Sequence, residues 1–152
     1  MLLLPDLINF AKTYASQQPN IETAIVVSGD SEVSKLILNI ANSGDHCTLI
    51  AVIPTHDPDI KDEDTRQFRN NLMFFIVKKT DTTGGNDLRL HNFSICQVEI
   101  KKLANYFLNL IDEEAEDCIF KDVDYNTMPI TPVSNYFGQN GYLLELVTKT
   151  SL

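Results

Sequence analysis

The sequence has few cysteines, few basic residues and no long apolar run, and each shortage excludes a class of function. Its three cysteines, Cys47, Cys96 and Cys118, form no CxxC pair, so we expect free buried thiols and neither a metal site nor a disulfide framework. No apolar run approaches the ~20 residues that cross a bilayer, so no membrane partner is expected. The start, Met1-Leu2-Leu3-Leu4-Pro5, has no basic residues before its leucines and does not indicate a signal peptide.

Positive charge is also scarce, and this shortage bears on nucleic-acid binding. There are 12 Lys and Arg residues against 21 Asp and Glu residues, a formal net charge of -9. Binding a duplex generally takes a cluster of cations that displaces counterions, and here only Lys78-Lys79 and Lys101-Lys102 are adjacent. The composition therefore disfavours a protein that grips DNA, although it permits one past which DNA slides.

Phosphate-binding motifs are missing as well. The turn Ser28-Gly29-Asp30-Ser31 stands between a predicted strand and a predicted helix, where backbone N–H groups can face an anion. It has neither the GxGxxG nor the GxxxxGK[ST] spacing, and no lysine stands where a phosphate needs one. A plain capping turn is the first interpretation, and a small-anion site is the alternative.

The acidic run at residues 57–64 superficially resembles a calcium loop. It lacks the glycine and the twelfth-position glutamate of such loops, and Lys61 occupies a ligand position. The run is therefore interpreted as a solvated acidic loop. Its candidate interface residues are Asp57, Asp59, Asp62, Glu63 and Asp64.

Catalytic groups are not indicated either. His46, His56 and His91 have no partner at ligand spacing, and all three cysteines lie in or beside apolar segments. We expect no catalytic residue, no cofactor and no enzymatic activity. Two adjacent aromatic residues, Tyr136 and Phe137, precede a glycine in a predicted loop and are candidate interface residues, although packing back over the sheet edge fits equally well.

Hydrophobic periodicity predicts one α+β domain over residues 1–152, with a mainly antiparallel sheet, one or two covering helices and long polar loops. The best local signal is a helix over 94–112, where Ser94 and Gln97 form a capping box. The last predicted strand ends close to Leu152, so we expect little chain for a separate active site. Two other helices are predicted, one beginning at Pro5 and one at residues 30–31; for the second, a strand over 35–40 remains possible. The predicted strands are 23–28, 47–53, 71–79, 120–133 and 142–149. Long loops are predicted at 55–69 and 80–92, and a turn at Asn140-Gly141.

This order of elements resembles that of phage tail-terminator and neck-ring proteins. The similarity rests on the strand pair at 47–53 and 72–79, the helix at 94–112, and the closing hairpin over 120–148 with Pro129-Ile130-Thr131-Pro132 near its bend. The segment 23–42 is extra to the simple pattern. The resemblance implies a homo-oligomeric ring of a virion, assembled in the host cytoplasm, that joins the portal region to the tail around a DNA channel.

Two other functions remain open. In the first, residues 23–53 form a β-α-β unit of a small enzyme or anion-binding domain, which requires parallel pairing of the strands 23–28 and 47–53. In the second, the chain is a monomeric adaptor that binds another protein through Tyr136 and Phe137.

Overall fold

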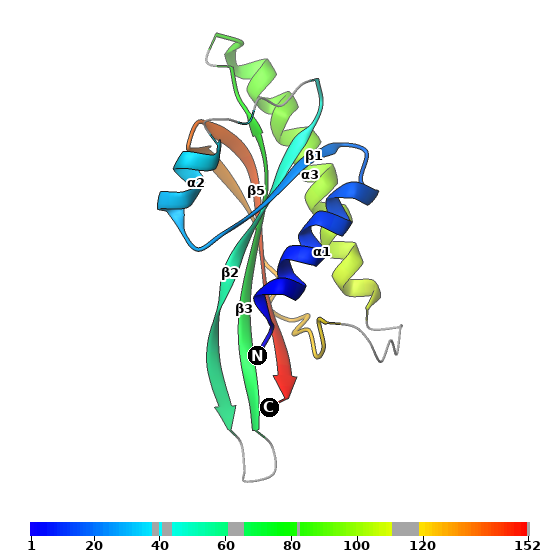
Figure 1. Cartoon of the computed structure of the whole chain (residues 1–152). Helices are drawn as coiled ribbons and strands as arrows, with labels where there is room; N and C mark the ends of the chain where they lie inside the picture. The colour runs from blue at the N-terminus through cyan, green and yellow to red at the C-terminus, as the bar shows by residue number, and fades with distance from the viewer. Residues whose placement is uncertain (38–39, 41–43, 61–65, 82, 111–118, 152) are drawn as a thin grey trace.

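The computed structural model describes the chain except for residues 38–39, 41–43, 61–65, 82, 111–118 and 152 (Figure 1). One open, five-stranded sheet has the strand order β1-β2-β3-β5-β4, with β1 and β2 parallel and the remaining pairs antiparallel. The predicted α+β class with a mainly antiparallel sheet is confirmed. The elements are α1 (Leu4–Gln17), β1 (Ile21–Val27), α2 (Asp30–Ile37), β2 (Cys47–Ile60), β3 (Arg66–Lys79), α3 (Gly85–Asn109), β4 (Ile130–Tyr136) and β5 (Gln139–Ser151).

The two faces of the sheet are covered by different helices. The helices α1 and α3 pack on one face, where Phe10, Phe74, Phe107 and Phe120 form a cluster of edge-to-face and tilted rings. The short helix α2 covers part of the other face, and Figure 1 shows it on the opposite side of the sheet from α1. Because both faces bury apolar side chains, the central strands contain runs of consecutive buried residues instead of a strict alternation.

The predicted loop at 55–69 is wrong for residues 55–60 and 66–69, because β2 continues to Ile60 and β3 begins at Arg66; residues 61–65 lie outside the described residues. Pro54 directly follows the predicted strand 47–53, and a proline there predicts the end of that strand. However, β1 pairs with β2 only as far as Val52, so the rest of β2 is an edge strand. No strand pairs with its outer side there, and the missing N–H group of a proline on that side costs no hydrogen bond. The register also shifts between Val52 and Thr55, which accommodates Pro54 at an irregularity.

The helix predicted to begin at Ser94 begins at Gly85. The predicted loop at 80–92 is therefore wrong from Gly85 onward. Its first turns extend beyond the sheet, and Leu88 and Leu90 there are exposed (Figure 1). A helix segment without a packing partner needs no apolar stripe, and so gave no periodic signal. The predicted end at Asp112 lies outside the described residues.

The last hairpin also differs from its prediction. Residues 120–129 are not a strand; they run irregularly along β5, with backbone bonds from Asp124 N to Val147 O at 2.8 Å and from Glu145 N to Pro129 O at 3.1 Å. The turn lies at residues 137–138, and the predicted turn at 140–141 is part of β5. Gly141 serves close packing instead, since a Cβ there would lie 2.0 Å from the carbonyl oxygen of Ile76.

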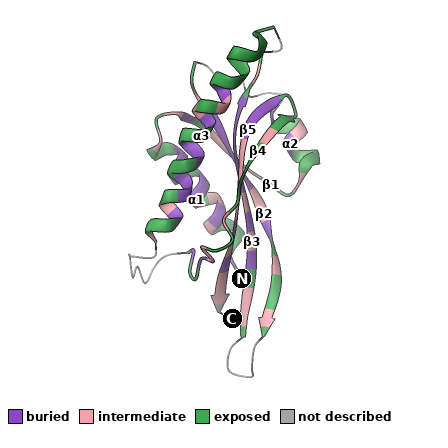
Figure 2. Cartoon of the chain, turned by 180° about the vertical axis from the view of Figure 1, so that it is seen from behind, coloured by how far each residue is buried: buried purple, intermediate pink, exposed green. Residues whose placement is uncertain are grey.

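Beyond the helices, the ends of β2, β3 and β5 form a three-stranded arm (Figure 1), and Figure 2 shows exposed and partly buried residues along it. Buried Asn70 lies in this arm. Its Oδ1 accepts the backbone N–H of Leu2 at 3.1 Å and lies 2.7 Å from His56 Nδ1, while its Nδ2 donates to Thr148 Oγ1 at 3.3 Å. This amide ties the start of the chain to three strands. None of the described helices is both long and apolar enough to cross a membrane.

Candidate functional site

The turn between β1 and α2 stands in the β-α-β unit that the anion-binding alternative requires. The strands β1 and β2 are parallel, with Thr23 opposite Thr48 and Val27 opposite Val52, so that topological prediction is confirmed. The turn thus has the position, at the carboxyl end of a strand and the start of a helix, at which doubly wound folds bind anions.

The charges of this turn, however, oppose an anion. The N–H of Ser28 donates to Glu32 Oε2 at 2.7 Å, and this bond is the largest cause that lowers the pKa of Glu32. Asp30 adds a second carboxylate in the first turn of α2. A carboxylate of the chain itself already occupies an N–H group that a phosphate would need, which supports the interpretation of a capping turn.

Tyr136 ends β4 and packs back onto the sheet. Its ring stacks on Phe75 with centroids 4.6 Å apart and planes at 3°, and its hydroxyl donates to Asp30 Oδ1 at 3.0 Å. Burial, followed by the hydrogen bond to Asp30, raises the pKa of Tyr136 to about 12. Of the two interpretations offered for the aromatic pair, packing over the sheet describes Tyr136.

Phe137 is more exposed, and among the ring contacts of the described residues its ring makes one, edge-to-face with Tyr136 at a centroid distance of 4.9 Å. It is 41% exposed and has a positive φ of 49°, and Gly138 after it has a φ of 78°. Since Tyr136 pairs with Gln139, these two residues form a two-residue hairpin turn with positive φ at both central positions, the type I′ geometry. That geometry favours Asn-Gly, and an aromatic residue at its first central position is strained.

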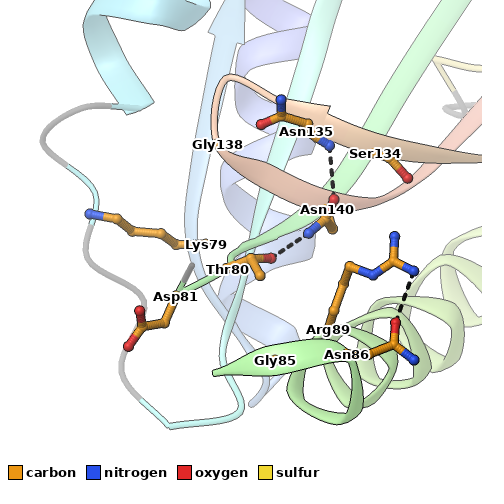
Figure 3. Close-up of a pocket in the computed structure, with 10 residues that line it drawn as sticks. All are labelled: Lys79, Thr80, Asp81, Gly85, Asn86, Arg89, Ser134, Asn135, Gly138 and Asn140. Carbon is orange, nitrogen blue, oxygen red and sulfur yellow. Dashed lines mark hydrogen bonds between the residues drawn. The ribbon is translucent and has the colours of Figure 1, made fainter. Parts of the chain in front are cut away.

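A cavity of about 950 Å³ lies between this turn and the start of α3 (Figure 3). Asn140 supports its wall: its Oδ1 accepts from Asn135 N at 2.8 Å, and its Nδ2 donates to Thr80 Oγ1 at 2.5 Å. Figure 3 shows the side chain of Arg89 between the helix and the turn, while that of Lys79 points away from it. The cavity was missed by sequence reasoning because its residues come from a segment predicted as a loop and from a misplaced turn. The other lining residues are Asp81, Gly85, Asn86, Ser134 and Gly138.

The chemistry of this cavity is polar and its charge is mixed. Arg89 donates to Asn86 Oδ1 at 3.0 Å, so its guanidinium is already partly bound within the helix. Asp81 accepts from the N–H and the hydroxyl of Thr83, and the N–H bond is the largest cause that lowers the pKa of this carboxyl group. The cavity therefore combines the partly bound guanidinium of Arg89 with an ionised carboxylate, an arrangement suited to polar contacts with a protein surface.

On the sheet face beside α2 lies a second hollow, hereafter the trough, of about 380 Å³. Half-buried Val52, Met73 and Val147 contribute to it from three neighbouring strands, and Val52 stands opposite Met73 in the register. Thr55, Asn71 and Glu145 supply polar groups on the same strands. No described helix covers this part of the face, because α2 packs farther along the strands.

Two residues of the predicted acidic interface, Asp57 and Asp59, lie on strand β2 in the arm and not on a loop. Asp57 Oδ2 accepts from Asn71 Nδ2 at 2.9 Å, and Asp59 forms an ion pair with Lys149 at 2.9 Å. Both bonds link neighbouring strands of the arm. The other three predicted interface residues, Asp62, Glu63 and Asp64, lie outside the described residues.

Two of the three cysteines meet beneath α3. Cys47 and Cys96 are fully buried free thiols with their Sγ atoms 3.7 Å apart, which confirms that expectation for them; Cys118 lies outside the described residues. The hydrogen bond with Cys47 and then burial raise the pKa of Cys96. Within the described ranges, no group of three or more His, Cys, Asp or Glu residues is placed to hold a metal ion.

Comparisons with protein-family models, with curated proteins and with solved structures found no match to this chain.

Proposed function

We propose that the chain is a structural subunit of a virion ring at the neck or tail of a phage, where it joins the portal region to the tail. The observation that carries the proposal is the three-stranded arm beyond the helices, which is paired along β3 as far as Gln67 and Ser151. Beyond buried Asn70, the far end of the arm buries little surface within its own chain, as exposed Pro58 and Ile60 show, and contact with a neighbouring subunit would bury more.

The residues at the open edges of the sheet favour subunit contacts through side chains and disfavour contacts in which a strand of a neighbour pairs with the edge. Pro54 and Pro58 stand on the open stretch of β2, and Pro132 stands on β4 at the other edge of the sheet. Proline withholds the N–H group that an incoming strand would need, so these edges resist uncontrolled pairing. A ring interface is heterologous and joins two different patches, and the arm and the Phe137 turn supply two such patches.

The net charge of -9 supports the same function. A channel lined by such subunits would repel the phosphate backbone of DNA and let it pass without adhering. The partners in this proposal are further copies of the chain and other virion proteins.

Native mass spectrometry and negative-stain electron microscopy of the purified chain test the proposal. We expect one closed oligomer with a central opening, and no binding to duplex DNA at physiological salt. A chain that stays monomeric at high concentration, and that is absent from particles of its source, would contradict the function.

A second candidate function rests on the parallel β1-α2-β2 unit, with the Ser28 turn as a site for a small anion. Titration with inorganic phosphate, followed by NMR of the backbone amides at residues 28–31, tests it. Saturable shifts that grow in Glu32→Gln, in which the competing carboxylate is removed, would support this candidate. Unchanged spectra in both proteins would eliminate it.

A further inference from the structure

The conformation of Phe137 conflicts with the local preference of its turn. Asparagine or glycine would adopt the positive φ of 49° at little cost, whereas a phenylalanine there is strained and leaves an apolar ring 41% exposed. Strain at an exposed position is typical of residues kept for a contact. Stacking of Tyr136 on Phe75 and its bond to Asp30 hold the turn rigid, so the ring of Phe137 is presented in a fixed place.

The trough offers a matching receptor on the same chain. Its floor consists of Val52, Met73 and Val147, which stay half-buried without a covering helix among the described elements. A thioether such as that of Met73 makes favourable contacts with an aromatic ring, and a carboxylate such as that of Glu145 suits the positive edge of the ring. The volume of about 380 Å³ admits a phenylalanine side chain and part of its turn.

The ring of Phe137 does not reach the trough of its own subunit. Gln139 follows the turn, and the trough residues Glu145 and Val147 stand farther along the same strand. At about 3.3 Å per residue, the two features are separated by roughly 20–26 Å. Both belong to the side of the sheet on which α2 packs. Val52 and Tyr136 adjoin the core of that side, and the ring of Phe137 lies edge-to-face against that of Tyr136, with centroids 4.9 Å apart. A second copy of the chain can therefore supply the aromatic ring that the trough of the first copy cannot receive from its own Phe137.

We propose that Phe137 of one copy inserts into the trough of another copy. The contact rests on the self-association in the proposed function and names the residues that make it. It joins two different patches, as a ring interface must, and removes from water both an exposed ring and an uncovered apolar floor.

Two variants test the contact by removing opposite halves of it. Phe137→Asn removes the ring and relieves the turn, and Val147→Lys places a charged side chain in the trough. At concentrations too low for association, we expect Phe137→Asn to unfold at a higher temperature than the wild type. At higher concentrations its association should be about thirtyfold or more weaker, as at a central aromatic contact. Thr55→Arg, at an exposed residue of the trough, replaces Val147→Lys if that variant folds poorly. The matched control is Leu108→Gln, which removes an apolar residue that is 40% exposed on α3.

Mixing the variants gives the decisive measurement. Each variant alone lacks one half of every contact, but a mixture can pair the intact ring of Val147→Lys with the intact trough of Phe137→Asn. Analytical ultracentrifugation should show weakened association of each variant alone, partial recovery in the equimolar mixture, and wild-type behaviour of Leu108→Gln.

The outcomes separate this contact from the ring proposal. If the wild type forms rings and Phe137→Asn forms them equally well, the contact is wrong and the ring stands. If the wild type forms only dimers that Phe137→Asn abolishes and the mixture restores, the contact stands and the ring is wrong. No recovery on mixing would overturn the contact, and a monomeric wild type would overturn both.

Discussion

The hydroxyl of Tyr136 donates a hydrogen bond to Asp30 Oδ1 at 3.0 Å, which joins the end of β4 to the start of α2 across 106 positions of the sequence. The bond connects the exposed turn at Phe137 to the turn of the β-α-β unit. The two segments singled out in the sequence as separate candidates are therefore one structural unit.

This bond predicts a dependence of stability on alkaline pH. The pKa of Tyr136 is about 12 in the fold against an ordinary value of 10.0, so the neutral phenol contributes its full stabilisation below pH 10 and loses it as pH rises from 10 to 12. Tyr136→Phe should lose about 0.5–1.5 kcal/mol at neutral pH, and its deficit against the wild type should shrink over that range. Urea unfolding at several pH values measures both effects. A deficit that does not change with pH would contradict this role of the phenol.

Gly141 predicts a large effect of a single methyl group. Gly141→Ala should destabilise the fold by about 3 kcal/mol or more, because the new Cβ would lie 2.0 Å from the carbonyl oxygen of Ile76, a backbone atom that cannot move alone. Gly29→Ala is the matched control, since nothing lies within 4 Å of a Cβ at that position. Thermal unfolding of the two variants gives the comparison. Equal melting temperatures would show that β3 and β5 are not in this register.

Asn70 predicts a penalty for leaving buried polar groups unpaired. Asn70→Ala should cost about 2–4 kcal/mol, since it removes the acceptor of the Leu2 N–H and the donor to Thr148. The neighbouring Asn71→Ala should cost less than about 1 kcal/mol, because the bonds of Asn71 to Thr55 and Asp57 are exposed. Denaturant unfolding measures the difference, and hydrogen exchange of the Leu2 amide should accelerate only in Asn70→Ala. Similar costs for the two variants would rule out the anchoring role of Asn70.

The buried thiol pair predicts slow chemical modification. Cys47 and Cys96 have no exposed surface, and the raised pKa of Cys96 keeps its thiol protonated, so both should react with a thiol reagent only as fast as the helix α3 opens. Labelling at neutral pH, followed by peptide mass mapping that distinguishes Cys118, measures the rates at each cysteine. Rapid labelling of Cys47 or Cys96 in the folded protein would contradict their burial, whereas labelling in denaturant should be complete.

The prediction of helices and strands succeeded where a local pattern faces a core. Pro5 opens α1, the β-branched run before Ser28 is β1, and the apolar runs after Cys47 and Leu72 pair in the sheet. It failed where the surroundings decided the outcome. Pro54 does not end β2, because β2 is an edge strand at that point. The helix α3 begins before Ser94, and its first turns were not predicted because they extend past the sheet and have no apolar stripe.

The candidate site was predictable only in part. The aromatic pair was found because Tyr136 and Phe137 are adjacent and precede a glycine, but their opposite roles depend on Phe75 and Asp30, which are distant in sequence. The trough and the cavity beside Arg89 gave no signal, since their linings come from several strands and a helix.

By itself, the sequence determined the order of the elements, the α+β class and the shortage of cations, because periodicity and charge are local or additive properties of the chain. Only the tertiary structure decided the parallel pairing of β1 with β2, the use of Gly141 for packing, and the division of Tyr136 and Phe137 into an anchor and an exposed ring. Each of these depends on contacts between residues far apart in sequence, and a pattern of neighbours along the chain carries no record of such contacts.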